Sequence, residues 1–142
     1  MVRTRIKEAL TGFPIEIIFS SGEEYGRRMH GMTGEGSSGA GSLAGQCSLL
    51  EDGHGHDALI LVWINAGAGK QEADFLSTIA HESFHAWTFI QGVMYEGRTV
   101  EVDTRHDEAE AYQYERIFCA VHSLVAKGLS DSKRKRHAKV KA

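Results

Sequence analysis

The chain has 142 residues, 42% hydrophobic and 25% charged, a composition typical of a single soluble globular domain. Its net charge of −3 combines an acidic body with a basic end. Residues 133–141 hold six of the 16 Lys and Arg residues, which leaves 10 basic against 19 acidic residues, about −9, in the rest of the chain. This balance argues against nucleic acid as a ligand of the folded body.

We expect one domain over residues 1–130, with a Gly/Ser-rich loop at 31–45, followed by a basic, disordered tail at 131–142. No apolar run reaches the length of a membrane span, and the N-terminus lacks the apolar stretch of a secretory signal. Cys47 and Cys119 are far apart in sequence, which indicates reduced thiols. These features predict a cytoplasmic protein without membrane contact. Contact with nucleic acid is expected only through the tail.

The first half of the chain is predicted to form short helices and strands. In order, we expect a short helix at 3–10, a strand at 14–19, a helix or turn at 23–30, a strand at 46–50, a hairpin connection at 51–57 and a strand at 58–65. The last of these strands is strongly apolar. It fits either an edge that pairs with an extended peptide or a buried strand.

Two long helices are expected to follow. The first covers about residues 70–91 and closes at Gly92, and the second starts near Arg105 and stops at Gly128. Short extended pieces at 93–95 and 99–102 fit the connection between them. The predicted fold class is α+β: a small, largely antiparallel sheet of about three strands packed on two long helices.

The first long helix carries the motif H-E-S-F-H at residues 81–85. Residues four apart lie one above the other on a helix, so His81 and His85 can bind the same metal ion. Glu82 is too close to them in sequence to complete a tetrahedral site, but it can act as a base toward a metal-bound water. An apolar stripe lies on another side of the helix and is suited to the core. Its members are Ile79, Ser83, Ala86, Trp87 and Ile90.

A third ligand is expected from the second helix. Glu108 and Glu110 are two residues apart and project to opposite sides, so only one of them can bind the metal directly. We favour Glu108, because Ala111 shares its face and would let the two helices approach closely. Asp107 and Glu110 are weaker candidates, and His106 is a remote one. Tyr112, on the same face as Glu108, is expected to pack between the helices or to donate a hydrogen bond in the site.

H-E-S-F-H followed by D-E-A-E-A-Y resembles the gluzincin-like zincin metallopeptidases, and most closely the small single-domain zincins of bacteriophages and prophages. The preceding hydrophobic strand, Leu59 to Asn65, fits the same pattern. The resemblance covers about residues 58–118. It implies a Zn²⁺ site formed by His81, His85 and Glu108, with Glu82 as the catalytic base.

These features predict a zinc-dependent hydrolase that cleaves peptide bonds in a peptide or protein substrate. Two alternatives stay open. One is a non-catalytic, zinc-containing interaction or regulatory module of a phage, and the other is an amidase that acts on cell-wall peptide.

Overall fold

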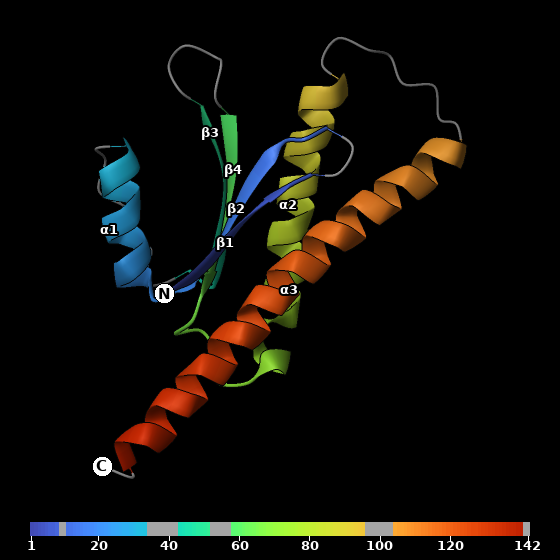
Figure 1. Cartoon of the computed structure of the whole chain (residues 1–142). Coiled ribbons are helices and arrows are strands. Elements are labelled where there is room, and N and C mark those ends of the chain that lie inside the picture. Colours follow the sequence, from blue (N-terminus) through green and yellow to red (C-terminus); the bar gives the residue numbers. More distant parts are fainter. Residues whose placement is uncertain (9–10, 34–42, 52–57, 96–103, 141–142) are drawn as a thin grey trace.

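The computed structural model describes residues 1–8, 11–33, 43–51, 58–95 and 104–140. Its elements are β1 (Val2–Lys7), β2 (Pro14–Ser20), α1 (Gly22–Thr33), β3 (Gly45–Glu51), β4 (Ala58–Asn65), the 3-10 turn η2 (Glu72–Phe75), α2 (Leu76–Tyr95) and α3 (Thr104–Val140). In this part of the chain the strands form one sheet in the order β1-β2-β4-β3. Helix α1 lies on one face of the sheet, and α2 and α3 lie on the other (Figure 1). The class is α+β, as predicted.

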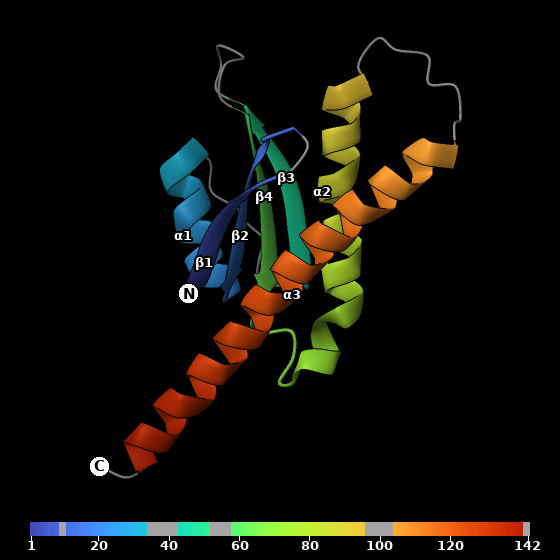
Figure 2. The same ribbon diagram turned by 45° about the vertical axis from the view of Figure 1, so that its right-hand side comes forward.

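The sheet is mixed, with one more strand than expected. β1 pairs with β2 and β3 pairs with β4 in antiparallel fashion, but β2 and β4 run parallel in the centre. A parallel pair needs a crossover connection, and α1 lies in the chain between these two strands. The central position of β4 also rules out its role as an edge, because it pairs on both sides and is buried from Ile60 onward. Among the described strands, β3 forms the edge beside α2 (Figure 2).

The predicted first helix is wrong, because residues 2–7 form β1. Burial in this strand alternates strictly, with Val2, Thr4 and Ile6 half-buried and the basic residues between them exposed. A period of two is the pattern of a strand. The backbone N–H and C=O groups of this segment pair with β2, whereas in a short helix they would have paired within the segment. Gly12 lies in the turn into β2 with a φ of 69°, a left-handed conformation that favours glycine.

The alternation of β2 and β4 divides the core into two layers. The larger layer lies between the sheet and helices α2 and α3, and the smaller one lies under α1. In the smaller layer, Tyr25 of α1 stacks on Trp63 of β4 with ring centroids 4.3 Å apart. Trp63 is therefore a core residue, fully buried from solvent.

Helix α2 starts later and ends later than predicted. Residues 72–75 form the 3-10 turn η2, where Asp74 accepts hydrogen bonds from the backbone N–H groups of Lys70 and Gln71. The α-helix then runs from Leu76 through Gly92 to Tyr95. Gly92 therefore lies within the helix, so the expected extended piece at 93–95 is also wrong. The piece at 99–102 lies outside the described residues.

Helix α3 continues through Gly128, where the sequence predicted its end. A Cβ atom at Gly128 would overlap the ring of Phe19 in β2, so this glycine lets the helix cross the sheet closely. The helix then extends away from the sheet to Val140 (Figure 1). Residues 131–140, part of the tail predicted to be disordered at 131–142, form its last turns, and the residues at positions 132–139 are exposed. In the described part of the chain, no helix combines the length and apolarity needed to cross a membrane.

Gly128→Val is expected to destabilise the protein by about 1–3 kcal/mol, because the added side chain forces Phe19 out of a packed core. Chemical denaturation measures the change in the free energy of unfolding. Gly92→Ala is the matched control: it also replaces a glycine within a helix, but nothing lies within 4 Å of its added Cβ. This variant should be as stable as the wild type or more stable. Equal effects of the two substitutions would contradict the close crossing of α3 and β2.

Candidate metal centre

Helix α2 separates most of its packing residues from the two histidines, as predicted, but it buries Glu82, which was expected on the histidine side. Ile79, Ser83, Ala86 and Ile90 are fully buried against the sheet and α3, whereas His81 and His85 are exposed. A helix that packs against the core along one stripe exposes the opposite side to solvent, and here the exposed side carries the two imidazoles.

The side chains of His81 and His85 meet at their Nε2 atoms, which lie within hydrogen-bond distance of each other. Their Nε2 atoms are 3.0 Å apart, and the ring centroids are 4.6 Å apart with the planes nearly perpendicular. Two nitrogens bound at about 2.05 Å to one tetrahedral ion lie roughly 3.3 Å apart. The spacing of His81 and His85 therefore fits two ligands of one zinc ion with little rearrangement.

Glu82 turns away from solvent toward the edge strand. Only 6% of the residue is exposed, and its carboxylate accepts a hydrogen bond from the backbone N–H of Cys47 in β3. Burial raises the pKa of Glu82 above its ordinary value, although the charges of His81 and His85 and the Cys47 N–H act in the opposite direction. Burial, with a contribution from the charge of Glu82, also raises the pKa of the Cys47 thiol to about 12. The motif thus presents two exposed imidazoles and one buried carboxyl group.

Gly45 lets α2 lie this close to β3. A Cβ atom at this position would be 2.7 Å from Cγ2 of Thr78 and 3.0 Å from Cγ of Glu82, both on α2. It would also be 2.9 Å from the carbonyl oxygen of Trp63 in β4. Such contacts are too short for a side chain. The glycine at the start of β3 is therefore part of what positions Glu82.

Helix α3 approaches α2 through a different face from the one predicted. Gln91 donates a hydrogen bond of 2.8 Å to Gln113, and the Tyr114 hydroxyl donates one of 3.2 Å to the carbonyl of Ala80. Ile117, one turn further along, is buried on the same side. In contrast, Ala111 is exposed, and Tyr112 is 59% exposed. The expected helix contact through Ala111 and Tyr112 is therefore wrong.

Glu108 and Glu110 are the two main candidates for the third ligand. The side chains of residues 104–108 lie outside the described residues, so Glu108 as a ligand stays a prediction, as do His106 and Asp107. Glu110 is described, half-buried on the α2-facing side. Within the described part of the chain, no third His, Cys, Asp or Glu joins His81 and His85 in a group that could hold a metal. The face of α3 that contacts α2 carries Glu110, so the packing argument for Glu108 is lost. Glu108 stays the candidate that the sequence resemblance implies, and Glu110 is the candidate on the contacting face.

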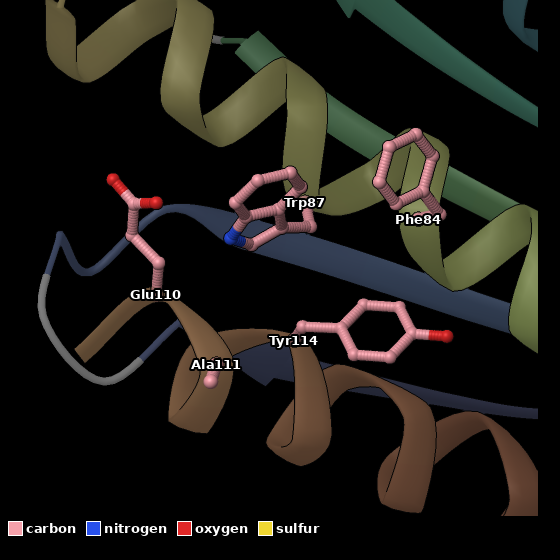
Figure 3. Close-up of a pocket in the computed structure, with 5 residues that line it drawn as sticks. All are labelled: Phe84, Trp87, Glu110, Ala111 and Tyr114. Carbon is pink, nitrogen blue, oxygen red and sulfur yellow. The ribbon is translucent and has the colours of Figure 1, made fainter. Parts of the chain in front are cut away.

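A pocket of about 300 Å³ lies between α2 and α3. Phe84 and Trp87 line it from α2, and Glu110, Ala111 and Tyr114 line it from α3 (Figure 3). The side chain of Glu110 extends from α3 to one side of Trp87, and Tyr114 lies across from both aromatic rings of α2 (Figure 3). Phe84 directly precedes His85 and is 51% exposed. The sequence allowed Trp87 to line a substrate pocket but favoured a place in the core, because the pocket depends on the crossing of the two helices.

Comparisons with protein-family models, with curated proteins and with solved structures each found no match to this chain. The case for a function therefore rests on the geometry of the residues themselves.

Alanine variants of Glu108 and Glu110 are expected to differ sharply in zinc affinity. Glu108→Ala should weaken binding by more than the 10- to 100-fold typical of losing a group that only orients a ligand. Glu110→Ala, which truncates a side chain of the pocket wall, should bind zinc within about tenfold of the wild type by the same scale. Competition with a chelator of known affinity measures both. The reverse result would move the ligand to Glu110 while keeping the two histidines.

Proposed function

We propose that the protein is a zinc-dependent peptidase whose metal is held by His81, His85 and a carboxylate from the start of α3, with Glu108 favoured. The observation that carries this proposal is the pair of Nε2 atoms 3.0 Å apart beside a buried glutamate. Two neutral imidazoles and one carboxylate are a ligand set of hydrolytic zinc sites, and they leave a position open for water. When bound, zinc supplies Lewis acidity, lowering the pKa of water to about 7 and polarising a carbonyl group.

Glu82 is the proton carrier of the proposed reaction. As the residue next to His81, it is too close in sequence to serve as a third tetrahedral ligand, and its carboxylate is free to accept a proton from the attacking water. Its raised pKa favours holding that proton until the leaving amine takes it up. The Cys47 N–H fixes the carboxylate in place at the edge strand. Glu82 therefore acts from an oriented and largely water-excluded position.

The arrangement around the histidines suits an extended peptide. On one side lies β3, an edge among the described strands, whose outward backbone groups can pair with an added strand. On the other side lies the pocket formed by Phe84, Trp87 and Tyr114, which fits an apolar side chain of the substrate. A peptide bound between them would cross the imidazole stripe of α2. This placement supports a peptide substrate over a smaller amide.

Glu82→Gln separates an enzyme from a non-catalytic zinc protein. The variant should keep the fold and the zinc, because Glu82 is not a ligand, and should lose at least about 100-fold in hydrolysis because the base is gone. Hydrolysis is measured by mass spectrometry of a proteome-derived peptide library and of cell-wall peptides. His81→Ala is the matched control, and it should lose both zinc and activity.

Two outcomes would count against the proposal. If wild-type protein holds zinc and neither substrate set is cleaved faster than by Glu82→Gln, the non-catalytic module is the better account. If only the cell-wall peptides are cleaved, and Glu82→Gln abolishes that cleavage, the site is that of a cell-wall amidase. A general peptidase would then be excluded.

A further inference from the structure

A second group of charged side chains lies on the face of the sheet opposite the histidines. Glu16 of β2 is buried there, with 3% of the residue exposed. Its carboxylate accepts a 2.8 Å hydrogen bond from Arg5 and a further hydrogen bond from Arg28. Arg3 forms a longer ion pair of 3.9 Å with the same carboxylate. A buried carboxylate needs such partners, because an unpaired charge away from water is costly.

The sheet register explains why these side chains meet. Arg5 lies directly opposite Glu16 in the β1–β2 pair, and Arg3 follows two residues away on the same face. Arg28 comes from α1, which covers this face of the sheet. Together with Thr4, these side chains line a cavity of about 320 Å³, which we call the arginine cavity.

The arginine cavity holds more positive charge than Glu16 can neutralise. Three guanidinium groups face one carboxylate, which leaves two positive charges within the lining. The side chains of Arg3 and Arg5 are 58% and 61% exposed, so a large part of each is open to solvent as well as paired with Glu16. The buried Nε of Arg28 has no hydrogen-bond partner among the described residues. Neutralising the single charge of Glu16 would not require three guanidinium groups.

Among the described residues, the neighbouring acidic side chains do not supply the missing negative charge, because they pair with other groups. On α1, Glu23 pairs with Arg27 at 2.6 Å, and Glu24 pairs with the N-terminal amino group at 3.4 Å. Lys7, two residues beyond Arg5 on the same face of β1, adds a further positive charge nearby. The surplus is local, since the chain as a whole is acidic.

We propose that the arginine cavity binds a small ligand through a phosphate group. Guanidinium groups present paired N–H donors that match phosphate oxygens, and Glu16 holds two of them in fixed positions before the ligand arrives. A phosphate monoester carries a charge of about −1.5 to −2 at neutral pH, which balances the surplus of two, whereas one carboxylate would balance only half of it. The cavity is also within the usual size range of small-molecule sites.

Calorimetric titration of the full chain with inorganic phosphate, at constant ionic strength, tests this proposal. The wild type should bind about one phosphate per chain. Arg3→Gln should weaken binding about tenfold or more, because a charge-assisted hydrogen bond is lost. Arg5 and Arg28 still satisfy Glu16 in this variant, so the fold should be retained. Arg27→Gln is the matched control, since it removes the same charge from a residue that pairs with Glu23 outside the cavity lining.

A second substitution at Arg3 and a second anion, acetate, complete the test. Arg3→Lys retains the charge but loses the paired donors, so it should also bind phosphate more weakly than the wild type. Acetate, titrated in the same way, should bind much more weakly than phosphate. Absence of saturable phosphate binding to the wild type would overturn the proposal. Equal losses in Arg3→Gln and Arg27→Gln, or tighter binding of acetate than of phosphate, would also overturn it.

Discussion

The close packing of α2 on the edge strand β3 is the constraint on which the candidate site depends. It requires the absence of a side chain at Gly45, and it brings the carboxylate of Glu82 to the backbone N–H of Cys47. The same rotation of α2 keeps His81 and His85 in solvent with their Nε2 atoms together. One orientation of one helix therefore both shields the proposed base and exposes the proposed ligands. A rotation of about 100°, one residue on the helix, would move His81 and His85 to the buried positions of Glu82 and Ala86.

Helix α3 stabilises this orientation from the other side. It contacts α2 through Gln113 and Tyr114, and it crosses β2 where Gly128 meets Phe19. Nε2 of His122 lies 2.6 Å from the carboxylate of Glu72, in the turn that precedes α2. Because α3 contacts both the start of α2 and the sheet, the pocket beside Phe84 is a consequence of how three elements pack. A change in the angle at which α3 crosses α2 would alter both the pocket and the distance of the candidate third ligand from the two histidines.

The sequence predicted the features that depend on local patterns. The strands at 14–20 and 58–65 are apolar runs, and the histidine pair follows from the spacing of four on a helix. Features set by contacts between distant segments were missed or misassigned. A glycine is typical of a helix end, so the sequence predicted the end of the helix at Gly128. In the structure this glycine instead makes room for the ring of Phe19, more than 100 residues earlier in the chain. The burial of Glu82 and the face of α3 that meets α2 likewise depend on tertiary packing.

X-ray absorption at the zinc edge of the zinc-loaded full chain tests the central claim most directly, because it reports the atoms bound to the metal. The account predicts about one zinc per chain, with imidazole nitrogen scattering from two histidines at about 2.0–2.1 Å and the remaining ligands oxygen. The imidazole signal should be lost when His81 and His85 are both replaced by alanine. A sulfur ligand at about 2.3 Å, or zinc binding that persists unchanged in that double variant, would contradict the account.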